Sequence, residues 1–71
     1  MPSQATGFAY KDEHGKIDVS TVQDDEIGVM VNYLVVQERV LIRQGEPDWF
    51  IKSMFEGKAK GSIVKIVITE V

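Results

Sequence analysis

The chain has 71 residues, of which 44% are hydrophobic and 27% are charged, with a net charge of −3 and no cysteine. These values predict one folded domain over residues 1–71 and exclude a second domain, a disordered chain, disulfides and thiolate metal sites. No apolar run reaches the roughly 18 residues that a membrane helix needs, and the first residues lack the pattern of a signal peptide. We therefore expect a cytoplasmic protein that does not enter a membrane.

The small size of the domain bears on its assembly. A core built from fewer than about 70–80 residues rarely gives more than a few kcal/mol of net stability, and disulfides, metals or oligomerisation are the usual supplements. The sequence excludes disulfides and offers a single histidine as a nitrogen ligand for a metal. We therefore expect a homo-oligomer, with a dimer favoured.

Two short alternating runs near the N-terminus predict a β-hairpin. Phe8 and Tyr10 alternate with other residues, and Ile17 and Val19 do the same after a polar loop. Gly15 lies late in that loop, where a positive φ is favoured. We expect the four apolar side chains to share the face of the sheet that meets the core.

The next segment predicts an amphipathic helix. The stretch from Thr21 to Asp25 contains overlapping helix-start signals, and the apolar residues that follow recur at the spacing of one helical face. That stripe consists of Ile27, Met30, Val31, Leu34 and Val35. We expect the helix to end near residue 37 and a short extended segment to cover 39–43. The periodicity of three apolar residues leaves helix, strand and loop open over 37–44.

A second helix is predicted between Pro47, which suits the first helical position, and Gly57, which suits the position just past the end. Its core stripe consists of Phe50, Ile51, Met54 and Phe55. Trp49 lies beside this stripe and has two interpretations. It either covers the edge of the core or anchors a partner protein, because tryptophan is enriched at binding hot spots.

The last ten residues, 62–71, alternate as a β-strand with one apolar face and one mixed face. Val64, Ile66 and Ile68 form the apolar face, which we expect to meet the core. Ile63, Val67 and Val71 fall on the other side with polar neighbours. We expect this mixed side to be the open face of the sheet, and we take its three apolar residues, together with Trp49, as candidates for an interface.

These elements predict an α+β domain of two layers. A small antiparallel sheet combines the N-terminal hairpin with the C-terminal strand, and two helices cover one of its faces. The expected order is β-β-α-(β)-α-β, in which the bracketed strand stands for the uncertain segment at 39–43.

The sequence contains no recognisable catalytic, cofactor or metal site. His14 is the only histidine, and its acidic neighbours in a hairpin turn point in divergent directions, whereas a metal site gathers ligands from separate segments. Ser20, Thr21 and Ser53 suit helix caps or surfaces and have no base beside them. We therefore expect a protein that is not an enzyme and that binds no cofactor or metal.

Two other functions remain as alternatives. Lys52, Lys58, Lys60 and Lys65 with Trp49 would suit a nucleic-acid-binding module, although the acidic pI of about 4.9 disfavours it. A small-molecule site would need converging polar groups in a pocket, which we expect to form only between subunits.

Three segments carry a resemblance to known proteins: residues 15–22 (GKIDVSTV), 31–35 (VNYLV) and 57–70 (GKAKGSIVKIVITE). In these the chain resembles small uncharacterised proteins found in phages, prophages and proteobacterial genomes. The resemblance implies an accessory protein of phage type and carries over no catalytic residue. We expect such a protein to act through protein–protein association.

Overall fold

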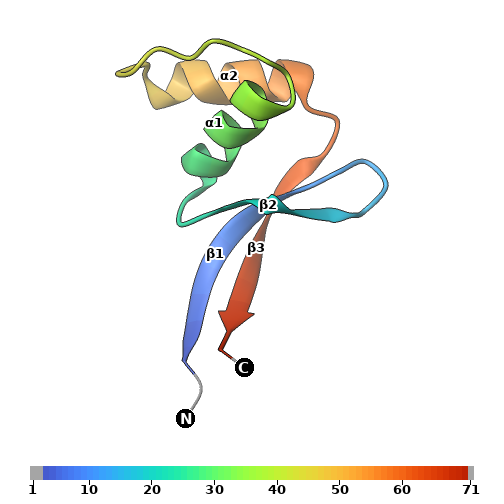
Figure 1. Ribbon diagram of the computed structural model, residues 1–71. Helices are drawn as coiled ribbons and strands as arrows, with labels where there is room; N and C mark the ends of the chain where they lie inside the picture. The colour runs from blue at the N-terminus through green and yellow to red at the C-terminus, as the bar shows by residue number, and fades with distance from the viewer. Residues whose placement is uncertain (1–2, 71) are drawn as a thin grey trace.

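The computed structural model describes residues 3–70. It contains strands β1 (Gln4–Lys11), β2 (Ile17–Gln23) and β3 (Ser62–Thr69) and helices α1 (Glu26–Val36) and α2 (Asp48–Lys58). The strands form one antiparallel sheet of order β2-β1-β3, so the C-terminal strand pairs with the first strand of the hairpin (Figure 1). The predicted α+β architecture is confirmed, and the optional strand at 39–43 is absent from the described residues.

The hairpin turn is held by a single aspartate. The Asp12 Oδ1 atom accepts hydrogen bonds from the backbone N–H groups of His14 and Lys16, both at 2.9 Å. Gly15 adopts a φ of 86°, a region that L-residues other than glycine rarely enter. The predicted turn and the role of its glycine are confirmed.

Strand β2 departs from regular pairing with β1. Phe8 pairs with Gln23 and Tyr10 pairs with Asp18, so residues 19–22 of β2 bulge opposite the single residue between Phe8 and Tyr10. The bulge turns Val19 outward, where its side chain is 79% exposed. Ile17 is also exposed, so the expectation that Ile17 and Val19 face the core is wrong.

Helix α1 begins at a side-chain cap and packs against all three strands. The Asp25 carboxylate accepts the Gly28 N–H at 2.7 Å, as an N-cap residue does. The helix ends at Gln37 as predicted, but its buried face is rotated from the predicted stripe. Val29 and Tyr33 are buried together with Met30 and Leu34, whereas Val35 is exposed.

The connection between the helices is neither helix nor strand. Val40 and Ile42 pack against the core, while Leu41 between them is 92% exposed. Arg39 adopts a φ of 55°, and the Val40 N–H donates to the Leu34 carbonyl at 2.9 Å, which turns the chain back along α1.

Helix α2 packs on α1 and contacts no strand through its backbone. Pro47 was predicted at the first helical position but is the N-cap residue, so the helix begins one residue later than predicted. Gly57 was predicted just past the helix end but lies inside the helix. Ile51 and Phe55 are buried as predicted.

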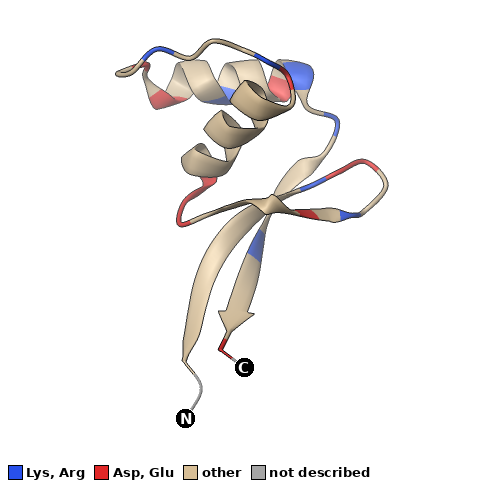
Figure 2. Cartoon of the chain, in the orientation of Figure 1, with Lys and Arg blue, Asp and Glu red and all other residues tan. Residues whose placement is uncertain are grey.

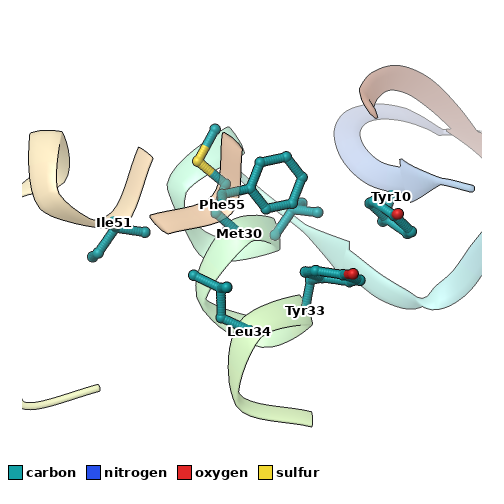
Figure 3. Packing of buried hydrophobic residues seen from close by; sticks show 7 residues of the cluster. Tyr10, Met30, Tyr33, Leu34, Ile51 and Phe55 are labelled. Atoms are coloured by element: carbon teal, nitrogen blue, oxygen red, sulfur yellow. The ribbon is translucent and has the colours of Figure 1, made fainter. Parts of the chain in front are cut away.

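Three aromatic rings connect the helices to the sheet (Figure 3). Tyr10 of β1 and Tyr33 of α1 stack with ring centroids 4.4 Å apart. Phe55 of α2 meets both rings edge-on, at 6.0 and 5.4 Å. Because stacked and edge-to-face pairs are the favoured aromatic geometries, this triad joins both helices to the sheet through favourable ring contacts.

Candidate functional site

Strands β1 and β3 form a ribbon that extends beyond the rest of the fold. They pair without a break from Lys11–Ser62 to Gln4–Thr69, whereas β2 pairs with β1 only from Phe8 onward. Residues 4–7 and 66–69, which we call the arm, therefore lack a third strand, and they project away from the helices (Figure 1).

The far end of the arm is closed by Ser3 and Glu70. The Glu70 N–H donates to the Ser3 carbonyl at 2.8 Å, which continues the ladder. The Ser3 hydroxyl donates to the Glu70 carboxylate at 2.9 Å, and this bond lowers the pKa of that carboxyl group. The ribbon is thus paired to its tip.

The register with β1 decides which face of β3 meets the core. Residues directly opposite in an antiparallel pair share a face. Tyr10 lies opposite Ile63, and both belong to the helix-covered side, where Ile63 packs against the core. The interface candidate Ile63 is therefore a partly buried core contact.

The open face of the sheet carries the apolar side of β3. Val64, Ile66 and Ile68 lie opposite Ala9, Gly7 and Ala5, on the side away from the helices. A Cβ atom on Gly7 would lie 3.7 Å from Ile68 Cδ1 and 3.7 Å from Val22 Cγ1, which places Val22 on this face as well. We call this set the open-face stripe: Val22, Val64, Ile66 and Ile68. The expectation that the β3 members of this stripe meet the core is wrong, because β1 presents its aromatic side chains from the other face.

The arm also exposes an apolar side chain on the helix side. Val67 lies opposite Thr6 and is 62% exposed, because the helices do not extend over this part of the ribbon. Ile68, on the opposite face, is 45% exposed. Both faces of the arm thus offer apolar surface to solvent.

The molecule has more surface than a folded monomer of its size. Its accessible area is 5290 Å², whereas a monomer of 8.0 kDa is expected to expose about 4,450 Å². Its radius of gyration is 12.9 Å, against about 11 Å for a compact chain of this length. The excess of about 800 Å² fits the elongated outline in Figure 1.

The other predicted interface residues lie elsewhere. Trp49 is 70% exposed at the start of α2 and touches Phe50 edge-on, so the core-edge interpretation is wrong. Trp49 is not part of the arm, because it lies on α2, whose backbone approaches no strand. Val71 lies outside the described residues. Of the four candidates, Val67 alone is described on the arm.

A second feature is a polar hollow of about 310 Å³ beside the aromatic triad. It is lined by Tyr10, Asp12, Glu13, His14, Tyr33, Gln37, Glu38, Lys58 and Lys60. The Tyr33 hydroxyl donates to Glu38 at 2.6 Å, and the Tyr10 oxygen accepts the Gly61 N–H at 2.9 Å. Burial, reinforced by the bond to Glu38, raises the pKa of Tyr33 well above its usual value, so its phenol stays protonated. The hollow forms within one chain, not between subunits, and both phenol groups already bind the protein itself.

The four lysines of the nucleic-acid alternative lie on α2, on the connection that follows it and on β3. Lys58 and Lys60 line the polar hollow with three acidic residues. Lys65 lies opposite Phe8 on β3, and α2, which carries Lys52, does not contact β3. Figure 2 shows basic and acidic positions interspersed around the helices and the hairpin turn. Lys58 and Lys60 thus share their surroundings with acidic side chains, which disfavours contact with a phosphate backbone.

Within residues 3–70, no three histidine or acidic side chains gather in a way that could hold a metal ion. None of the helices in this part of the chain has the length and apolar character needed to cross a membrane. Comparison with family models, curated proteins and solved structures found no match. The arm and the hollow are therefore the features of this structure that bear on its function.

Proposed function

We propose that this protein acts through protein–protein association and that it assembles with copies of itself through the arm. The observation that carries the proposal is the apolar surface on both faces of a ribbon that projects from the core. The resemblance to small phage and prophage proteins supports a non-enzymatic accessory role. A dimer is the simplest assembly.

The surface area supports this choice. A protein–protein interface of standard size takes about 800 Å² from each partner. The molecule exposes about that much more surface than a compact monomer of its mass. Association through the arm would bring the exposed area of each copy to the value of an ordinary folded domain.

The polar hollow gives weaker support for a small-molecule function. Its tyrosine hydroxyl groups already have protein partners, and its lysines face acidic side chains within the same hollow. The aromatic rings beneath it form the centre of the core. These groups serve the fold whether or not a ligand is present.

Size-exclusion chromatography with light scattering tests the association. We expect the wild-type mass to be twice 8.0 kDa. The substitution Ile68→Lys places a charge on the exposed end of the open-face stripe and should give a monomer with an unchanged far-UV circular dichroism spectrum. Val19→Lys is the matched control, because Val19 is equally apolar and more exposed but lies on β2, away from the arm.

Two outcomes would contradict the proposal. A wild-type protein that stays at 8.0 kDa up to millimolar concentration does not associate with itself. A dimer that Val19→Lys dissociates and Ile68→Lys leaves intact would place the contact on β2 instead of the arm.

A further inference from the structure

The two edges of the sheet differ in how they are protected. An exposed strand edge offers unpaired N–H and C=O groups to other chains, and proteins block such edges with bulges, prolines, charges or covering elements. The β2 edge is interrupted by the bulge at residues 19–22. The β3 edge pairs regularly over all eight residues on its β1 side and has no bulge. Its sequence has no proline and a single charge, Lys65.

No strand within residues 3–70 pairs with the outer edge of β3. The strand contacts β1 and α1 and no other helix or strand. In the sheet order β2-β1-β3 its second side has no partner strand. A long, regular and mostly apolar edge of this kind is a template for another strand.

We propose that β3 pairs with β3 of a second copy, antiparallel, about a two-fold axis that passes through Ile66, and so joins two three-stranded sheets into one of six strands. This inference rests on the association proposed above and specifies its geometry. The axis stands perpendicular to the sheet, which keeps the helices of both copies on the same side. Residues that lie opposite each other across the axis then come from the same face of each copy.

The side chains of β3 select the position of the axis. An axis at Lys65 would place two lysines directly opposite each other, which destabilises a strand pair. An axis at Val64 would place Ile68 opposite Lys60, outside the strand. An axis at Ile66 places Ile66 opposite itself and Val64 opposite Ile68 of the second copy, so every apolar member of the strand's open face meets an apolar partner.

The same axis also determines which residues meet on the helix side of β3. Lys65 of each copy lies opposite Val67 of the other, so the contact occurs twice in the dimer. Because Val67 is 62% exposed and lies outside the core cluster, its side chain can be changed without disturbing the fold. A charge at position 67 therefore reports on a lysine of the partner copy.

Charge substitution at position 67 is the first test. Val67→Lys should raise the dimer dissociation constant at least tenfold relative to Val67→Glu at low ionic strength, because lysine repels and glutamate attracts Lys65 of the second copy. The difference should shrink at high salt, since exposed charges are screened. The double variant Lys65→Glu with Val67→Lys should restore dimerisation. Equal dissociation constants for the two single variants would overturn the register.

Single-cysteine cross-linking is the second test and uses the absence of native cysteine. Ile66→Cys should form a disulfide-linked dimer under mild oxidation, because residues directly opposite in antiparallel strands lie within disulfide range. Val64→Cys and Ile68→Cys should each fail alone, since their own copies lie about 14 Å apart. A mixture of these two variants should cross-link.

The outcomes separate the two proposals. Cross-linking of Val64→Cys or Ile68→Cys alone overturns the axis at Ile66. A dimer in solution that cross-links at none of these positions overturns strand pairing but leaves association in place. A monomer at all concentrations overturns both.

Discussion

Thr21 is almost fully buried although it is polar, and its hydroxyl group explains how β2 can bulge without losing hydrogen bonds. The Tyr10 N–H donates to Thr21 Oγ1 at 2.8 Å, and this hydroxyl donates in turn to the Asp18 carbonyl at 2.6 Å. The side chain thus replaces the backbone partner that the bulge removes from Tyr10. It also fixes β1 at Tyr10, the member of the aromatic triad that comes from the sheet.

The Thr21 hydroxyl should therefore contribute measurably to stability. Thr21→Val keeps the shape of the side chain but removes the hydroxyl partner of the buried Tyr10 N–H and of the partly buried Asp18 carbonyl, which should cost about 1–3 kcal/mol of unfolding free energy. Thr21→Ser retains the hydroxyl and should cost less than the valine substitution. Urea denaturation followed by circular dichroism measures both. A loss that is larger for serine than for valine would show that the methyl group matters more than the hydrogen bonds.

At the scale of elements, signals that act within a few residues were predictable and pairings between distant segments were not. The turn glycine Gly15 and the helix end near residue 37 depend on neighbouring residues, and both predictions are confirmed. Which face of β3 meets the core depends on its register with β1, more than fifty residues away. The alternation in β3 shows two faces and does not say which one lies opposite Tyr10. In the structure the mixed side of β3 lies on the same face as Phe8 and Tyr10. The sequence of β3 alone does not contain this information.

The burial of α1 illustrates the same limit. The spacing correctly predicted Met30 and Leu34 inside, but it assigned Val35 to the core instead of Tyr33. Tyr33 is buried because it stacks on Tyr10 of another element. The contact with β1 therefore determines which face of α1 is buried, and this face differs from the most apolar stripe of the helix. The arm was missed for a related reason, since the bulge that shortens the pairing of β2 depends on Thr21 reaching Tyr10.

Two glycines on either side of the connection into β3 should respond in opposite ways to the same substitution. A Cβ atom at Gly57 meets nothing within 4 Å, and the residue lies inside α2. Gly57→Ala should raise the unfolding free energy by about 0.5–1 kcal/mol, because alanine loses less backbone entropy in a helix.

Gly61, in contrast, has no room for a side chain. A Cβ atom there would overlap the Lys11 carbonyl oxygen and lie 2.7 Å from the Tyr10 hydroxyl oxygen. Gly61→Ala should lower the unfolding free energy by more than about 2 kcal/mol, because β3 must shift away from β1 where it enters the sheet. Thermal melts of both variants beside the wild type test the pair. Similar shifts for the two substitutions would contradict this account of the close approach.

At the scale of the whole molecule, stability and exposure are separated in space. The aromatic triad and the helices form a core at one end of the sheet, and the arm extends from the other end (Figure 1). The principal extents of 41, 29 and 17 Å describe a flat, long body in place of a sphere. A partner on the arm would lengthen the sheet without disturbing the core. This division explains why substitutions on the arm can probe association separately from folding.

Two carboxylates, Asp18 and Glu70, form hydrogen bonds at the edges of the molecule. We expect both to make the fold less stable in acid. Asp18 accepts hydrogen bonds from the Ser20 side chain and backbone and from Gln37, so it joins the bulge to the end of α1. These bonds, led by the Ser20 hydroxyl, lower the pKa of Asp18, and Ser3 lowers that of Glu70 at the tip of the arm. A lowered pKa in the folded state means that the unfolded chain binds protons more readily.

The sign of the pH dependence follows from these shifts. The contribution of each carboxylate should be present above its ordinary pKa, 3.8 for Asp18 and 4.5 for Glu70, and should vanish as the pH falls through the lower folded-state value. The protection factors of amides at the tip of the arm, which correct for the pH dependence of the intrinsic exchange rate, should therefore fall below about pH 4.5. Glu70→Gln should remove this acid response at the tip and leave the response near Asp18 unchanged. Asp18→Asn should have the reverse effect. Ser3 and Glu70 close the ribbon whose edge we propose to pair between copies. The dimer dissociation constant of the wild type should therefore rise over the same acid range. A dissociation constant that stays unchanged down to pH 3 would show that dimerisation does not depend on the Ser3–Glu70 contact.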